Sequence, residues 1–197
     1  MSNNTSVVSL ERYNSGLTYE DYVLNIKVNK DRFETYYESA ELKTEDKDFF
    51  ASISSTPNGI KKLMIIGEDW CPDVFRGMPL FARIAEAADI EMRIFPRDEN
   101  LDIMDEFLKD GEFRSIPVAV FYDDQLNEIA RWIERPVIGY EQSKQITDQT
   151  EKDMASASDQ EKRKNIRDQI YALYPSWQQE TVVEVKQLLS DQLVDNG

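Results

Sequence analysis

The sequence lacks histidine altogether and contains a single cysteine, Cys71, among its 197 residues. Without an imidazole, serine–histidine–aspartate and cysteine–histidine catalysis are excluded, and the commonest protein ligand of zinc and copper is missing. One thiol cannot form an internal disulfide, nor can it assemble a zinc site or an iron–sulfur cluster within the chain. We therefore expect no metal and no cofactor, and a reducing compartment.

Basic side chains are scarce and long apolar runs are absent. The chain carries 38 acidic against 23 basic residues, a formal charge of −15. A surface of that sign repels phosphate, so neither nucleic acid nor an anionic membrane is an expected partner. No apolar run approaches the length that spans a bilayer, and the first residues show no secretory signal. These absences predict a cytoplasmic protein.

Three segments of different character are expected to pack as one compact domain. Residues 1–58 are acidic and aromatic, and they predict a helical extension with helices beginning near Thr18, Asn29 and Thr44. Residues 59–138 alternate between strand and helix patterns and form the predicted core. In residues 139–197 strand patterns disappear, which predicts a second helical extension with helices over 159–174 and after a cap at Ser176.

The predicted core has the order β-α-β-α-β-β. Strands are expected at residues 61–67, 90–95, 116–122 and 126–132, and helices at 72–88 and 100–109. Two strands that bracket a helix usually run parallel, whereas the last two strands, joined by a short turn, form an antiparallel hairpin. The fold class is therefore α/β, with a central mixed β-sheet flanked by helices.

Cys71 lies where an apolar strand pattern gives way to a helix pattern. At such a position the backbone N–H groups and the helix dipole favour the thiolate, and Pro72 suits the first turn because it has no N–H to leave unsatisfied. Asp73 has the opposite effect, because a carboxylate beside a thiolate raises the thiol pKa. The sequence does not decide which effect is larger.

The motif around Cys71 resembles the active-site loop of the thioredoxin superfamily. Asp69-Trp70-Cys71-Pro72-Asp73-Val74 is similar to the family's Trp-Cys-Pro-Asp-Cys form. Pro79 falls where thioredoxins carry the proline that kinks the active-site helix. Ile116-Pro117, before a predicted strand, resembles the cis-proline loop that packs against the reactive cysteine. The resemblance covers about residues 60–135, and the added helices resemble those of a bacterial branch of thioredoxin-like proteins.

This resemblance implies a thioredoxin-like fold with extra N- and C-terminal helices, and it assigns roles to residues. Cys71 would be the catalytic residue. The substrate-binding residues would be Trp70, Pro72, Asp73, Ile116 and Pro117. Two positions depart from the family pattern: Val74 replaces the second, resolving cysteine, and Ile65 replaces a buried acid that assists it. Exchange passes through a mixed disulfide that a second thiol must resolve, so ordinary dithiol reduction is not expected.

Three functions remain open at this stage. The leading hypothesis is a monothiol thiol–disulfide oxidoreductase, in which Cys71 reacts with a protein disulfide or a low-molecular-weight thiol. The second is a redox-inactive module that binds a protein partner through the same loops. The third is a thiol sensor that forms a homodimer through a disulfide between two copies of Cys71. If Val74 substitutes for a native cysteine, the natural protein would be an ordinary dithiol oxidoreductase.

Overall fold

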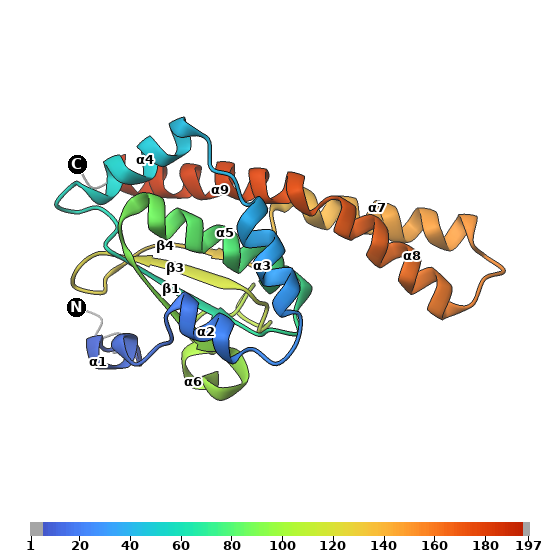
Figure 1. The fold of residues 1–197 in the computed structure, drawn as a ribbon, viewed down its shortest axis with the longest axis horizontal. Coiled ribbons are helices and arrows are strands. Elements are labelled where there is room, and N and C mark those ends of the chain that lie inside the picture. Colours follow the sequence, from blue (N-terminus) through green and yellow to red (C-terminus); the bar gives the residue numbers. More distant parts are fainter. Residues whose placement is uncertain (1–5, 195–197) are drawn as a thin grey trace. The chain divides into compact units, whose positions relative to one another are not determined.

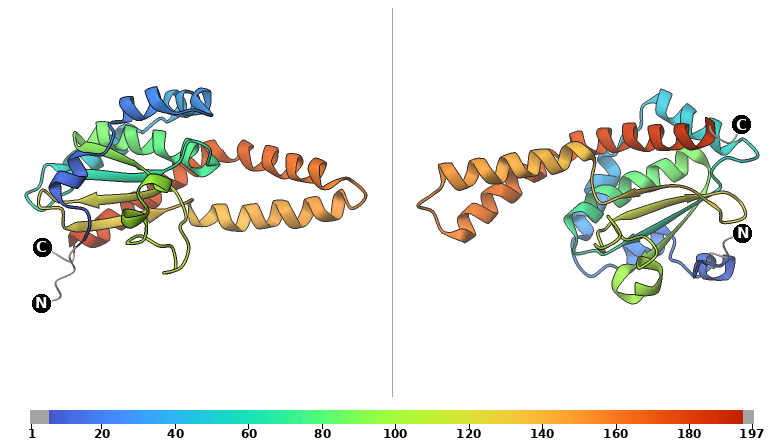
Figure 2. Two further views of the ribbon diagram at one scale, coloured as in Figure 1. Left: turned by 90° about the horizontal axis from the view of Figure 1, so that it is seen from below. Right: turned by 180° about the vertical axis from the view of Figure 1, so that it is seen from behind.

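A computed structural model describes residues 6–194 of the chain (Figures 1 and 2). The chain divides into two compact units, one containing the residues up to Glu134 and those from Val185 onward, the other containing Arg135–Glu184. Among the described residues, no helix combines the length and apolar character that crossing a bilayer requires. The division into an N-terminal extension, a core and a C-terminal extension stays a prediction.

The first unit is built on one four-stranded sheet in the order β2-β1-β3-β4. Its strands are β1 (Lys62–Gly67), β2 (Glu91–Pro96), β3 (Val118–Tyr122) and β4 (Glu128–Ile133). The pair β1 and β2 is parallel, whereas β3 runs antiparallel to both β1 and β4. The predicted mixed sheet and its hairpin are thus confirmed. The two central strands, β1 and β3, are apolar almost throughout, and nearly all of their residues are buried, as expected for strands covered on both faces.

Helix α5 (Pro72–Ala88) connects β1 to β2, and Cys71 precedes it, beyond the C-terminal end of the central strand β1. The helix ends at Asp89, whose left-handed backbone (φ 52°) closes the last turn. Helices α3 (Lys30–Ser39) and α4 (Thr44–Ser54) pack against α5 (Figure 1). Lys186, near the C-terminus, donates to Asp46 of α4 across 2.6 Å.

The N-terminal segment also covers the outer edge of the sheet. It contains α1 (Leu10–Asn14), which the sequence did not predict, and α2 (Tyr19–Asn25), whose predicted cap is confirmed because the Thr18 side chain accepts a hydrogen bond from the Asp21 N–H. Between these helices, Leu17 pairs with Ile94 of β2 through two backbone hydrogen bonds of 2.8 and 2.9 Å. The edge of β2 is therefore occupied by the chain's own backbone.

Two predicted helices differ from the structure. The helix expected at 100–109 is reduced to a 3₁₀ turn, η1 (Arg97–Glu99), and α6 (Leu101–Met104). After Met104 the backbone makes i to i−3 hydrogen bonds, from the Glu106 N–H to Ile103 and from the Phe107 N–H to Met104, and the chain then turns at Asp110 and Gly111, both with positive φ. The last helix, α9 (Tyr174–Val194), begins before Ser176, which is therefore not its cap.

The second unit contains α7 (Val137–Asp153), α8 (Asp159–Ala172) and the start of α9. Helices α7 and α8 lie side by side and are joined at one end (Figure 2). Trp177 is fully buried, and its indole N–H donates to Gln142 across 2.6 Å. Helix α7 was not predicted because its sequence is polar and lacks an apolar stripe. Only Gly139 and Thr150 of its residues are buried.

Candidate functional site

Cys71 stands at the N-terminus of α5, immediately after the loop that follows β1. Its backbone is extended (φ −85°, ψ 124°), and its carbonyl accepts hydrogen bonds of 3.1 Å from the N–H groups of Val74 and Phe75. Pro72 occupies the first helical position, where its missing N–H leaves nothing unsatisfied. The sulfur is thus attached to the cap residue of a 17-residue helix, at the positive end of its dipole.

The loop before β3 lies against Cys71, as the resemblance implied. The sulfur is half-buried, and it lies 3.8 Å from the carbonyl oxygen of Ile116, to which the thiol donates. The Ile116–Pro117 peptide bond is cis. Pro117 also lies close to α5, since a Cβ placed on Gly77 would come within 3.3 Å of the proline ring. The structure therefore brings together Cys71, Ile116 and Pro117 from segments more than forty residues apart.

Val74, at the position of the absent second cysteine, is completely buried. It packs against Gly67 at the end of β1, where an added Cβ would come within 2.8 Å of a valine methyl group. Ile65, at the position where the resemblance places an acid, is also fully buried. The interior behind Cys71 therefore offers neither a second thiol nor a carboxylate at these two positions.

Asp73 and Arg76 form a buried ion pair on the first turns of α5. The carboxylate and guanidinium are 3.5 Å apart, and the Arg76 side chain has no exposed surface. Arg76 also donates to the carbonyl oxygen of Glu134 across 3.1 Å, and its guanidinium lies 6.0 Å from the centre of the Trp132 ring. Sequence reasoning selected Asp73 but missed Arg76, whose pairing shows only in the Asp-x-x-Arg spacing.

Comparison with known proteins decides the family. A family model described as thioredoxin matches residues 16–147. The chain belongs to the thioredoxin family. No curated protein matches it.

Two solved structures share the fold of this thioredoxin-family chain. One is a protein of unknown function from Pseudomonas aeruginosa, with a TM-score of 0.64 and 15% identity, covering 93% of this chain and 98% of that one. The other is an HIV epitope scaffold, with a TM-score of 0.64 and 16% identity, covering 93% and 99%. At such identities the likeness shows the fold alone.

In this thioredoxin-family chain the N-terminal segment contacts the loop that carries Trp70, and the motif did not predict this contact. The Trp70 side chain is 48% exposed, and the Arg97 guanidinium lies 5.1 Å from its ring centre. Asp69 accepts hydrogen bonds from the backbone N–H groups of Lys27 (2.7 Å) and Val28 (3.2 Å). The segment after α2 is therefore bound directly to the loop that precedes Cys71.

A pocket of about 470 Å³ opens beside Trp70. Its lining residues come from the N-terminal segment, the loop before Cys71 and the region after β2, and they include Tyr22, Lys27, Glu68, Asp69, Trp70 and Glu99. Burial raises the pKa of the Glu68 carboxyl, although the Asp98 N–H donates to it and acts in the opposite direction. Sequence reasoning missed this pocket, because α2 lies far from the motif along the chain.

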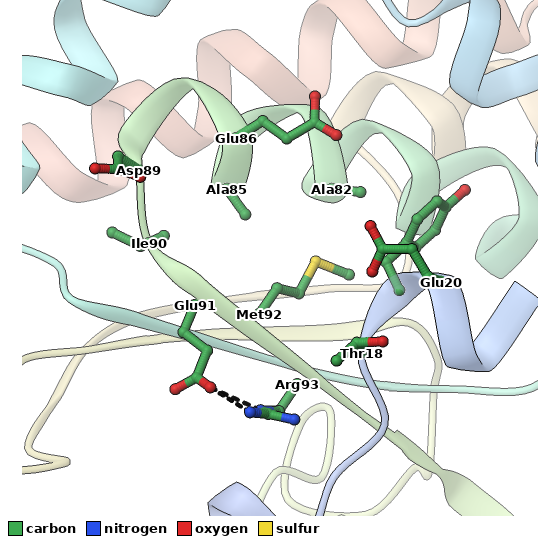
Figure 3. Close-up of a pocket in the computed structure, with 11 residues that line it drawn as sticks. Thr18, Glu20, Ala82, Ala85, Glu86, Asp89, Ile90, Glu91, Met92 and Arg93 are labelled. Carbon is green, nitrogen blue, oxygen red and sulfur yellow. Dashed lines mark hydrogen bonds and ion pairs between the residues drawn. The ribbon is translucent and has the colours of Figure 1, made fainter.

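A second, smaller pocket of about 270 Å³ lies between α2, the C-terminal half of α5 and β2 (Figure 3). Its walls carry Glu20, Glu86 and Glu91, and the last of these pairs with Arg93. Cys71 is not among the lining residues of either pocket. Within residues 6–194, no three side chains of the metal-binding types gather closely enough to hold an ion.

Proposed function

We propose that this protein carries out thiol–disulfide exchange through Cys71 alone. The observation that carries the proposal is the place of the sulfur at the N-terminus of α5, partly exposed and beside the Ile116 carbonyl. Helix N-termini stabilise the thiolate, which is the nucleophilic form. The buried valine at position 74 supports a mechanism with one thiol instead of two.

The loop before β3 supports binding of an extended substrate segment. Within residues 6–194, the backbone N–H of Ile116 donates no hydrogen bond. An unpaired N–H next to a reactive sulfur suits main-chain pairing with a peptide that contains the target disulfide. Trp70, half-exposed on the other side of Cys71, would supply an apolar contact, with Pro72 and Pro117 shaping the surface between them.

The proposed reaction has two steps. The Cys71 thiolate attacks one sulfur of a substrate disulfide, so that a bond forms between them, the substrate's S–S bond breaks, and the other sulfur leaves as a thiolate that takes up a proton. A low-molecular-weight thiol, as its thiolate, then attacks the mixed disulfide at the substrate sulfur. This step releases Cys71 and leaves the substrate joined to the second thiol. Because Val74 has no thiol, the second step requires that external reactant.

The test is a disulfide reduction assay with and without added small thiol, on wild type and Cys71→Ser. We expect wild type to accumulate a mixed disulfide, visible by intact mass, and to turn over only when the small thiol is present. Cys71→Ser should do neither. Equal rates for the two proteins in the presence of thiol would show that Cys71 has no part in exchange.

A redox-inactive binding module is the second candidate, and the apolar surface at the site favours it. Trp70 and Val28 are each about half exposed and lie on segments joined through Asp69. If partner binding survives Cys71→Ser unchanged while exchange is absent, the binding function replaces the redox one.

The third candidate is a sensor that dimerises through Cys71, and the partial exposure of the sulfur supports it. Non-reducing electrophoresis after peroxide treatment tests it.

A further inference from the structure

The loop between β1 and α5 is a tight turn that begins at Glu68 and ends at Cys71. The Glu68 carbonyl oxygen accepts a hydrogen bond of 3.2 Å from the Cys71 N–H, so Asp69 and Trp70 are the two central residues of the turn. The chain itself joins this turn to the rest of the protein only at its two ends. The direction of Trp70 and the place of Cys71 therefore depend on what holds the centre of the turn.

Asp69 provides that hold through hydrogen bonds from three consecutive residues of the N-terminal segment. One carboxylate oxygen accepts from the backbone N–H groups of Lys27 (2.7 Å) and Val28 (3.2 Å). The Asp69 carbonyl oxygen accepts from the side-chain amide of Asn29 across 2.9 Å. These three contacts are the Asp69 clasp. Because the clasp holds both the side chain and the backbone of Asp69, it fixes the orientation of the turn as well as its position.

The residues that form the clasp are anchored before and after it. On α2, which precedes them, the Tyr22 side chain is only 4% exposed. Asn29 has a left-handed backbone (φ 59°) and directly precedes α3. Phe33 of α3 is fully buried, and its ring centre lies 6.4 Å from that of Phe75 on α5. The clasp therefore connects the turn to a helix that already packs on α5.

A second segment also holds the turn. Glu68 accepts a hydrogen bond of 2.7 Å from the Asp98 N–H. The Arg97 guanidinium lies 5.1 Å from the centre of the Trp70 ring, and it donates to the carbonyl oxygen of Arg114, in the loop before β3, across 3.4 Å. Contacts from segments far apart in the sequence thus converge on these four residues and connect them to the loop that faces Cys71.

We propose that Asp69 and Asn29 are positioning residues for exchange, because the clasp holds Trp70 and Cys71 at the spacing from the loop before β3 that an extended peptide disulfide requires. This inference rests on the proposed function and names its substrate class, disulfides carried by extended peptides. A peptide must meet Trp70 and the loop before β3 at the same time, whereas a small disulfide needs only the sulfur. Loss of the clasp therefore slows the peptide selectively.

The test compares two rates of mixed-disulfide formation with Cys71, followed by intact mass. One substrate is the symmetrical disulfide of a blocked Ala-Ala-Cys-Ala-Ala peptide, and the other is hydroxyethyl disulfide, which is small and neutral. Both rates are measured at a pH where the thiolate is fully formed, so that a change in thiol pKa does not enter the comparison. We expect Asp69→Ala to lower the ratio of the peptide rate to the small-disulfide rate by about tenfold, because small displacements of reacting groups cost that much or more.

Two further variants separate the clasp from the charge of Asp69. Asn29→Gly removes the side-chain amide, keeps a residue that adopts positive φ readily and leaves the Asp69 carboxylate in place. It should lower the same ratio several-fold. Asp69→Asn removes the charge but keeps an oxygen that can accept from Lys27 and Val28, so it should restore most of the ratio lost in Asp69→Ala.

Glu106→Ala is the matched control. The Glu106 carboxylate also accepts from a backbone N–H of the N-terminal segment, that of Val7, across 2.6 Å. Glu106 raises the pKa of Tyr122, the last residue of β3, which pairs with the start of β1, whereas Cys71 follows the end of β1. Glu106→Ala therefore removes a similar contact at the other end of the sheet, and its ratio should equal that of wild type.

Amide hydrogen exchange reports on the turn without any reaction of the thiol. The Cys71 N–H, which donates to Glu68, should lose protection in Asp69→Ala and in Asn29→Gly but not in Glu106→Ala. Unchanged protection in both clasp variants would overturn the inference.

The rates separate this inference from the proposed function. If wild-type Cys71 reacts with neither disulfide, exchange itself fails, and the positioning role fails with it. If both disulfides react and Asp69→Ala leaves their ratio unchanged, the positioning role is overturned and exchange stands. A fall in the ratio that Glu106→Ala reproduces would also overturn the positioning role.

Discussion

Asp73 and Arg76 lie one turn apart on α5 and pair across 3.5 Å where almost no water reaches them. Replacing Arg76 with methionine keeps much of the volume but deprives a buried carboxylate of this opposite charge. We expect Arg76→Met to lower the free energy of unfolding by about 3–5 kcal/mol, measured by urea denaturation. Adding Asp73→Asn should recover most of that loss, because the stranded charge is then gone. A double variant as unstable as the single one would contradict this account.

Val74 follows Cys71 by three residues, a spacing that brings side chains together on a helix. Replacing Val74 with cysteine provides a second thiol within disulfide reach. We expect Val74→Cys to form an internal disulfide on oxidation and to turn over without added small thiol, at a small cost in stability from the buried volume lost. Thiol alkylation followed by mass spectrometry checks the disulfide. Val74→Ala, which removes volume without adding a thiol, is the control and should stay dependent on external thiol.

The residues at the site differ in whether the local sequence alone could predict their roles. Cys71, Pro72 and Pro117 could be predicted because the motif and the X-Pro before a strand stand in local sequence. Arg76 could not be predicted, because an acid and a base three residues apart occur on many exposed helices. This pair differs in being buried, which the sequence does not show. Tyr22 could not either, because its place in the pocket depends on tertiary folding that no local pattern records.

Among the elements, a regular apolar spacing in the sequence decided which ones were predictable. Strands β1 and β3 and helix α5 carry apolar runs dictated by the core, so their existence followed from the sequence. Helix α7 presents few apolar side chains to any partner, and no periodic signal marked it. The helix predicted at 100–109 is shorter in the structure, because α-helical hydrogen bonding gives way to i to i−3 bonds after Met104.

Helix α8 has no buried residue, and a capping box closes its N-terminal end. The Ser158 side chain accepts from the Glu161 N–H, and the Glu161 carboxylate accepts from the Ser158 N–H across 2.9 Å. We expect Ser158→Ala to destabilise α8 by about 1 kcal/mol, seen as faster amide hydrogen exchange in that helix. Unchanged exchange there, with the β1 amides as internal reference, would show that the cap contributes nothing.

The same cap has a defined pH dependence. The hydrogen bonds from Ser158 lower the pKa of Glu161 below its ordinary 4.5, so the folded state favours the carboxylate. Its contribution is therefore complete above the unfolded pKa and is lost as the pH falls through the folded value. Protection of α8 in the wild type should decline in that acidic range, whereas Ser158→Ala should show a weaker decline.

For the whole molecule, the absence of histidine simplifies the titration of the site. Cys71 is the only side chain whose ordinary pKa lies between those of the carboxyl groups and those of tyrosine and lysine. We expect the alkylation rate of Cys71 to follow a single ionisation between about pH 6 and 9. Two resolved steps in that range would show that a carboxyl or phenol with a shifted pKa is coupled to the thiol. The variants Glu68→Gln and Tyr22→Phe would identify which of the two groups it is.

The three tryptophans differ sharply in their access to water. Trp132 and Trp177 are buried, whereas Trp70, directly before Cys71, has nearly half of its side chain exposed. A quencher dissolved in the medium, such as iodide or acrylamide, therefore reaches one indole far more readily than the other two. Trp70 is thus an intrinsic optical reporter beside Cys71, and the proposed formation of a mixed disulfide there should change its fluorescence in unlabelled material.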